Sequence, residues 1–129
     1  MSKNIKELDE KSFDEILKDT DKLVVVEFYT TTCPNCLAIA PVYEDLSKEL
    51  GQDAIFTQVN AQLNMPIASR YGVMATPTFK FFCKGGPIGE LVGAIHATVL
   101  RNTIKDLIRH RIECVTKSTR ISYEMDGYG

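Results

Sequence analysis

The sequence predicts one α/β domain, built on a mixed β-sheet of four or five strands with helices on both faces. Residues 23–29 are nearly all apolar and rich in β-branched side chains, which is typical of a central strand covered on both faces. Segments with helical periodicity alternate with such strands along the chain. Residues 78–92 hold two β-rich runs around a turn with Gly and Pro, as an antiparallel hairpin would.

The N-terminal half is expected to alternate helices and strands. Ser12 followed by Glu15 is a capping-box pattern, which predicts a short helix over residues 13–18. A second helix is predicted over residues 37–50, with a kink at Pro41 because proline lacks an N–H and crowds the preceding turn. The remaining expected elements are strands, namely the central strand, residues 55–60 and a weakly signalled short strand near residues 5–8.

The C-terminal half is expected to close the domain with a hairpin and a helix. A short helix over residues 64–72 precedes the hairpin, whose strands are predicted at residues 78–83 and 89–92 with a turn at 84–87. An amphipathic helix follows over residues 98–112, which places the domain at residues 1–112. Residues 113–129 are predicted to be a loosely attached or disordered polar tail, although the alternation in residues 120–125 would also allow an edge strand.

The charge balance argues against nucleic acid and membranes as partners. Lysine and arginine number 15 against 17 aspartates and glutamates, which gives a formal net charge of −2. The charged N-terminus lacks the apolar core of a secretory signal, and every apolar run is shorter than the roughly 20 residues that span a bilayer. We therefore expect a monomeric cytoplasmic protein that recognises its partners through apolar contacts and shape.

Two of the four cysteines, Cys33 and Cys36, lie between the apolar strand and a helical segment. A cysteine at a helix N-terminus is stabilised as a thiolate, which is the nucleophile of thiol–disulfide exchange. Pro34 suits the first turn, where its missing N–H is not needed. A redox-active pair is the favoured interpretation, with an inert pair and a zinc site as alternatives. Zinc would need about two more ligands, and neither Cys83 nor Cys114 belongs to a second Cys-x-x-Cys, so we expect no metal and no bound cofactor.

Several landmarks in order and spacing resemble those of the thioredoxin family. They extend from about Ser12 to Ile112 and include the Cys33-Pro34-Asn35-Cys36 motif, the strand residues Val25 to Tyr29, Ala40-Pro41, Tyr71-Gly72-Val73, Thr76-Pro77-Thr78 and Val92-Gly93-Ala94. The resemblance implies the thioredoxin fold and a thiol–disulfide oxidoreductase that reduces disulfides in client proteins. It further implies a thioredoxin reductase as the electron donor.

The same resemblance implies the roles of the site residues. Cys33 would attack the client disulfide, Cys36 would resolve the mixed disulfide, and Pro77 would be a cis-proline facing the pair. The cis turn would offer the backbone of Ala75 and Thr76 to an extended client segment. The apolar rim around the first cysteine would consist of Tyr29, Thr32, Met74, Gly93 and Ala94.

Glu27 stands where the family usually has a buried Asp that exchanges a proton with the resolving cysteine. A carboxyl desolvated inside a strand should have a raised pKa, which suits proton transfer near neutral pH. Gln58 replaces a lysine that often faces this acid in the family. The alternative for Glu27 is an acid at the strand end that reaches water.

The motif also departs from the family. Thioredoxins usually carry Gly-Pro between the cysteines and a tryptophan before them, whereas this chain has Pro34-Asn35 and Thr32, and no tryptophan. Proline after the first cysteine is similar to glutaredoxins, so a glutaredoxin-like or disulfide-isomerase-like protein that uses glutathione is one alternative. A non-catalytic binding module with the same fold is the other.

Overall fold

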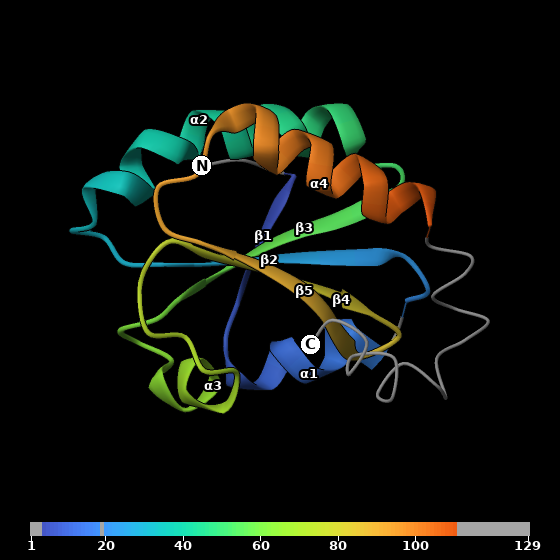
Figure 1. Ribbon diagram of the computed structural model, residues 1–129. Coiled ribbons are helices and arrows are strands. Elements are labelled where there is room, and N and C mark those ends of the chain that lie inside the picture. Colours follow the sequence, from blue (N-terminus) through green and yellow to red (C-terminus); the bar gives the residue numbers. More distant parts are fainter. Residues whose placement is uncertain (1–3, 19, 111–129) are drawn as a thin grey trace, which may run out of the picture.

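The fold is a single five-stranded sheet covered on both faces by helices (Figure 1), seen in a computed structural model that describes residues 4–18 and 20–110. The strands are β1 (Ile5–Leu8), β2 (Leu23–Tyr29), β3 (Ala54–Asn60), β4 (Thr78–Cys83) and β5 (Gly86–Val92), in the spatial order β1-β3-β2-β4-β5. The first three strands of this order run parallel, and β4 and β5 are antiparallel to their neighbours. The predicted mixed sheet is therefore confirmed, including the weakly signalled first strand.

The side chains of β2 point alternately to the two faces of the sheet, and each face is covered by a different pair of helices. Leu23 and Val25 belong to a core formed with α2 (Pro34–Leu50) and α4 (Ala97–Arg109). The intervening Val24 and Val26 belong to a core formed with α1 (Glu10–Lys18) and α3 (Met65–Arg70). Because side chains alternate between faces along a strand, Glu27 lies on the α2 and α4 face.

Tyr43 anchors α2 to the sheet beneath the site. Its ring is fully buried against Phe56 and Phe79. Its hydroxyl lies 2.6 Å from the carbonyl oxygen of Thr57 and 3.2 Å from that of Val25, and donates a hydrogen bond into this pair of acceptors. A polar anchor at mid-helix fixes the height of α2 above β2 and β3, and so the position of its N-terminus.

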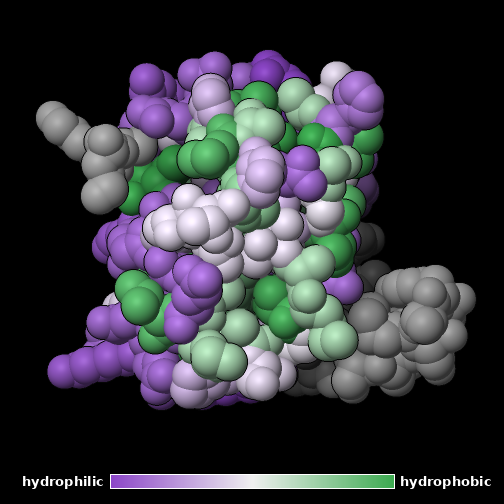
Figure 2. All heavy atoms as spheres, turned by 90° about the vertical axis from the view of Figure 1, so that its left-hand side faces the viewer, coloured by the Kyte–Doolittle hydropathy of each residue, from purple (hydrophilic) through white to green (hydrophobic). Residues whose placement is uncertain are grey.

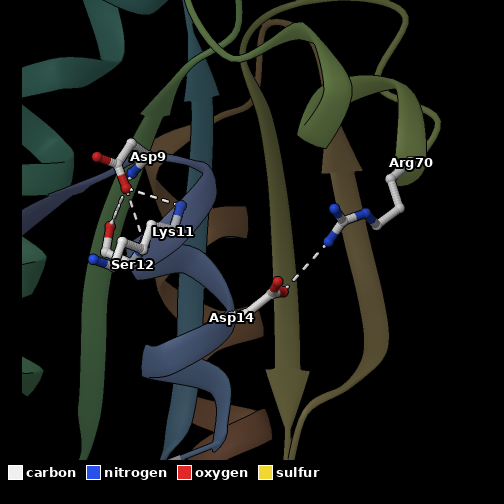
Figure 3. A network of polar contacts seen from close by, with 5 residues as sticks. All are labelled: Asp9, Lys11, Ser12, Asp14 and Arg70. Atoms are coloured by element: carbon white, nitrogen blue, oxygen red, sulfur yellow. Dashed lines mark hydrogen bonds and ion pairs between the residues drawn. The ribbon is translucent and has the colours of Figure 1, made fainter.

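The helix α1 begins earlier than the Ser12 capping box predicts. It starts at Glu10, and the Asp9 carboxylate accepts the backbone N–H groups of Lys11 and Ser12 at 3.1 and 2.9 Å. Ser12 returns the contact by accepting the backbone N–H of Asp9 at 3.0 Å, so Asp9 is the cap and Ser12 the third position of the box (Figure 3). The predicted start of the helix was wrong because Ser12 belongs to two overlapping segments, Asp9-x-x-Ser12 and Ser12-x-x-Glu15, and both have a residue at their first position that can cap a helix.

The hairpin turn is shorter than predicted. Lys84 and Gly85 both have positive φ, 51° and 85°, which forms a two-residue connection whose twist matches that of the strands. The second strand therefore begins at Gly86 rather than at residue 89. Pro87 is accommodated in it because β5 is an edge strand and the register shifts between Phe81 and Phe82.

The two longest helices also differ from their predicted bounds. The helix α2 begins at Pro34 rather than at residue 37, and it continues through Pro41 to Leu50. The closing helix α4 ends at Arg109, whereas the sequence predicted residue 112. The expected tail, residues 113–129, lies outside the described residues. Within the described part of the chain, no helix is long and apolar enough to cross a membrane.

Candidate active site

The cysteine pair lies where β2 gives way to α2, at the end of the sheet on the left of Figure 1. Cys33 is the N-cap of α2, with extended backbone angles, and its Sγ accepts the backbone N–H of Cys36 at 3.1 Å. Pro34 occupies the first turn, where no N–H partner is required. The first sulfur therefore takes the place of the capping oxygen that usually satisfies a free N–H at a helix start.

The two thiols have opposite electrostatic environments. Cys33 is partly exposed. Desolvation tends to raise its pKa, but hydrogen bonds outweigh this effect and hold the pKa of Cys33 below its usual value. These hydrogen bonds come from the side chains of Cys36 and Thr76 and from the backbone at Cys36 and Asn35. Cys36 is only 5% exposed, and burial together with the neighbouring Cys33 thiol raises its pKa to about 11. At neutral pH the exposed sulfur is thus the more readily ionised one.

The loop before β4 faces this pair across the end of the sheet. The Thr76–Pro77 peptide bond is cis, as the sequence predicted, and Pro77 is buried. The Cys33 thiol lies 3.3 Å from the Thr76 carbonyl oxygen and donates to it in its protonated form. The Pro77 carbonyl accepts the backbone N–H of Gly93 at 2.8 Å, which joins this loop to the segment after β5.

Glu27 lies inside the sheet on the face that α2 covers. Its side chain is 4% exposed, which contradicts the alternative of an acid that reaches water. Burial, followed by the charges of Cys33 and Glu7, raises the pKa of Glu27 to about 8. In the sheet register it lies between Gln58 of β3 and Phe79 of β4, so neither neighbouring strand places a cation beside it.

The residues predicted to form the rim are uncharged and differ in exposure. Tyr29 and Gly93 are partly exposed, whereas Thr32, Met74 and Ala94 are open to solvent. In the cis loop, Thr76 is partly exposed and Ala75 is open to solvent. Met74 is the extreme case, with 94% of its surface exposed. Figure 2 shows this end of the molecule, whose central part is mainly pale and green with purple side chains gathered toward its edges. Asn35 and Ala94 also line a shallow groove of about 340 Å³ between α2 and the start of α4.

The zinc alternative would require further ligands beside the cysteine pair. Among residues 4–18 and 20–110, no group of three or more His, Cys, Asp or Glu side chains is arranged to hold a metal ion. Cys83 lies at the far end of β4, next to the start of β2, whereas the Cys33 pair follows the end of β2. The sheet therefore separates Cys83 from the pair, and Cys114 lies outside the described residues.

Sequence reasoning missed Glu7, which lies next to the site at the edge of the sheet. Its carboxylate accepts a hydrogen bond from the Tyr29 hydroxyl at 2.9 Å and another from the Gln58 side-chain amide at 2.6 Å. The only available signal was the alternation of residues 5–8, which would have placed Glu7 on the same face as Ile5. Its partners are 22 and 51 residues away, so no local pattern could identify them.

The site defines a dithiol–disulfide redox protein built on a mixed α/β sheet. It combines a cysteine that caps the helix and ionises readily, a second cysteine buried three residues later, and a cis-proline that faces the pair. The comparisons with known proteins agree with this class. The family model described as Thioredoxin matches residues 4–106.

Similar proteins carry the same description. Thioredoxin of Oryctolagus cuniculus is 38% identical over 106 residues, covering 81% of this chain and 99% of that protein. Thioredoxin H4 of Arabidopsis thaliana is 37% identical over 90 residues, covering 67% of this chain and 76% of that protein. The crystal structure of Malassezia sympodialis thioredoxin superimposes with a TM-score of 0.75 at 31% identity, covering 81% of this chain and 90% of that one.

The chain belongs to the thioredoxin family, and it is a thiol–disulfide oxidoreductase.

Proposed function

We propose that the protein reduces disulfides of client proteins, with Cys33 as the attacking thiolate and Cys36 as the resolving thiol. The observation that carries this assignment is the contrast between the two sulfurs. One caps the helix, is partly exposed and has a lowered pKa, while the other is buried with a pKa of about 11. The first sulfur is both the more readily ionised of the two and the one open to a disulfide in another protein.

The reaction proceeds by two exchanges that conserve electrons and protons. The Cys33 thiolate attacks one sulfur of the client disulfide, so that a mixed disulfide forms and the other client sulfur leaves as a thiolate. Cys36 then loses its proton and attacks the Cys33 sulfur, which expels the second client thiolate. The client gains two electrons and two protons, and the protein holds a Cys33–Cys36 disulfide.

Glu27 is proposed to accept the proton of Cys36 in the second exchange, directly or through a water. The support is its burial on the face under α2 and its pKa of about 8, which lies between that of a free carboxyl and that of the buried thiol. At neutral pH roughly a tenth of a carboxyl with such a pKa is ionised, and this fraction rises as the pH approaches 8. The carboxylate form is basic enough to assist a thiol.

The cis loop is proposed to align the client. A carbonyl at Thr76, beside the Cys33 sulfur, suits an extended segment that pairs with the backbone of Ala75 and Thr76 as an added strand. The rim of Tyr29, Thr32, Met74, Gly93 and Ala94 would then cover the apolar side chains that flank the client disulfide.

We further propose a thioredoxin reductase as the electron donor and the cytoplasm as the compartment, with the protein acting as a monomer. A reducing compartment matches a pair that must return to the dithiol form after each cycle. The described cysteines of the pair are both free thiols, which is the form ready to react with clients.

Trapping of clients tests the assignment of the two cysteines. Cys36→Ser should accumulate stable mixed disulfides with clients, because the first exchange occurs and the second cannot. Cys33→Ser and the double variant are the controls, and both should capture nothing covalently. Equal capture by the double variant would overturn the assignment. Capture of glutathione alone, with no protein client, would favour the glutathione-dependent alternative.

The role of Glu27 has a separate test. Reduced protein is mixed with an aromatic disulfide that releases a coloured thiolate in each exchange, so the first and second steps appear as two phases. Glu27→Gln should slow the second phase and leave the first nearly unchanged. An unchanged second phase would remove Glu27 from the mechanism.

A further inference from the structure

Glu27 belongs to a row of polar side chains that crosses three strands. In the sheet register, Glu7 of β1 pairs with Gln58 of β3, and Gln58 pairs with Glu27 of β2. Residues paired in register across parallel strands point to the same face, so all three lie on the face that α2 and α4 cover. Gln58 is thus placed between two carboxyl groups.

The middle residue bonds to one acid of the row. The Gln58 side-chain amide donates to Glu7 Oε1 at 2.6 Å, and the Tyr29 hydroxyl donates to Glu7 Oε2 at 2.9 Å. Burial and then the hydrogen bond to Glu7 raise the pKa of Tyr29 to about 12, so this hydroxyl stays a donor at physiological pH. The Glu7 carboxylate is therefore fixed by one donor on each oxygen, although the residue lies at the exposed edge of the sheet.

We propose that Glu7 is a positioning residue: its carboxylate, fixed by Tyr29 and Gln58, opposes ionisation of Glu27 and so sets the pH range in which Cys36 resolves a mixed disulfide. The inference rests on the proposed role of Glu27 as the proton acceptor. In this arrangement Gln58 adds no positive charge beside Glu27 and instead brings a second negative one toward it.

Glu7 and Cys33 are the two groups whose charges raise the pKa of Glu27. Of these, Glu7 can be substituted without changing a thiol of the site. Cys33, the N-cap of α2, raises the pKa of Glu27, and the charge of Glu27 in turn raises the pKa of Tyr43 in α2. On its own strand Tyr29 also senses Glu27. The neighbouring strand β4 contributes Phe79, and α4 contributes apolar side chains to the same core. Among the described residues, no cation contributes to the pKa shift of Glu27.

The size of the effect follows from the strand spacing. Two strand intervals separate Glu7 from Glu27, which is about 9–10 Å at the backbone. At that distance, a unit charge partly screened by water shifts a pKa by about half a unit to one unit. The separation is close to the Debye length at physiological ionic strength, about 8 Å, so added salt should shrink the shift.

The test is the pH profile of the second exchange, followed with the same aromatic disulfide. In the wild type, its rate rises with pH as Glu27 becomes the carboxylate. In Glu7→Gln, the half-maximal pH should fall by about half a unit to one unit, and the difference should diminish at high salt. Glu15→Gln is the matched control, since Glu15 is an exposed acid on α1, at the other face of the sheet. It removes the same charge and should leave the profile in place.

A second variant examines how Glu7 is held. Gln58→Met keeps the side-chain length but removes the donor, and it should lower the half-maximal pH by less than Glu7→Gln does. The double variant should match Glu7→Gln alone, because Gln58 acts through Glu7. Additive shifts in the double variant would contradict that link.

The outcomes separate this inference from the role on which it rests. A wild-type profile in Glu7→Gln, or a loss of rate that is equal at every pH, would overturn the inference. If Glu27→Gln also leaves the second exchange unchanged, the proposed role of Glu27 fails with it. If Glu27→Gln slows that exchange while Glu7→Gln keeps the wild-type profile, only the role of Glu7 is wrong. A titration of the Glu27 carboxyl carbon by NMR gives the same comparison without turnover.

Discussion

Replacing Glu27 by glutamine should stabilise the protein, and by an amount that grows with pH. Glu27 is 4% exposed, and its pKa is raised from the ordinary 4.5 to about 8 by burial first and by the charges of Cys33 and Glu7 next. Below pH 4.5 the carboxyl is protonated in both folded and unfolded chains, so its ionisation costs nothing. Between pH 4.5 and 8 only the unfolded chain ionises, and the folded state therefore loses stability as pH rises.

The magnitude follows from the linkage between protons and folding. Each pKa unit corresponds to about 1.4 kcal/mol, so this one group should lower the free energy of unfolding by roughly 3 kcal/mol between pH 4.5 and 7. Any cost of placing the uncharged amide of the variant in the sheet is independent of pH. The difference between variant and wild type should therefore widen steadily through this range and level off above pH 8.

Urea unfolding of the reduced proteins at several pH values measures this difference. The free energies of unfolding of wild type and Glu27→Gln are compared at each pH, so that the titration of all other groups cancels. Glu15→Gln, an exposed acid on α1, is the control and should track the wild type. A difference between Glu27→Gln and wild type that does not change from pH 5 to pH 8 would refute the assignment of a buried, proton-retaining carboxyl.

Three further predictions concern the scaffold that positions the site. Tyr43→Phe should lower the free energy of unfolding, measured in urea, by about 1–3 kcal/mol, because the buried Thr57 carbonyl loses the hydrogen bond from the Tyr43 hydroxyl. An unchanged free energy would show that the hydroxyl is dispensable. Gly93→Ala should cost about 1–2 kcal/mol through its φ of +90° alone, since a Cβ there meets nothing within 4 Å; wild-type stability would contradict that strain. Asp9→Ala should lower Tm more than Asp14→Ala does, because Asp9 caps α1 whereas Asp14 forms only a surface ion pair with Arg70 (Figure 3). A larger drop in Tm for Asp14→Ala would reject Asp9 as the cap.

The parts of the site that sequence reasoning identified are those encoded within short stretches. The apolar run of β2, the Cys33-x-x-Cys36 spacing and the helix that follows are neighbours in sequence, so their geometry follows from a strand end joined to a helix start. The cis peptide at Pro77 was predicted only through the family landmarks, because a Thr-Pro pair by itself permits either isomer.

Other features depend on contacts that sequence patterns do not record. The burial of Glu27 depends on the layer of α2 above it, and the sequence left a buried acid and an exposed one both open. The position of Glu7 depends on the pairing of β1 with β3, two segments about 50 residues apart. Its strand was weakly signalled because Lys6 and Glu7 are charged and exposed at the sheet edge, and edge strands are often short and charged.

The central claim is that the two sulfurs differ in reactivity, with Cys33 ionised first. The most direct measurement is the rate of alkylation of each cysteine in the reduced native protein as a function of pH, resolved by peptide mass spectrometry. We expect Cys33 to react with a midpoint below the ordinary thiol range and Cys36 to stay unmodified until the protein unfolds, because burial and the neighbouring thiol raise the pKa of Cys36 to about 11. Modification of Cys36 before Cys33, or equal rates at the two sites, would contradict the account.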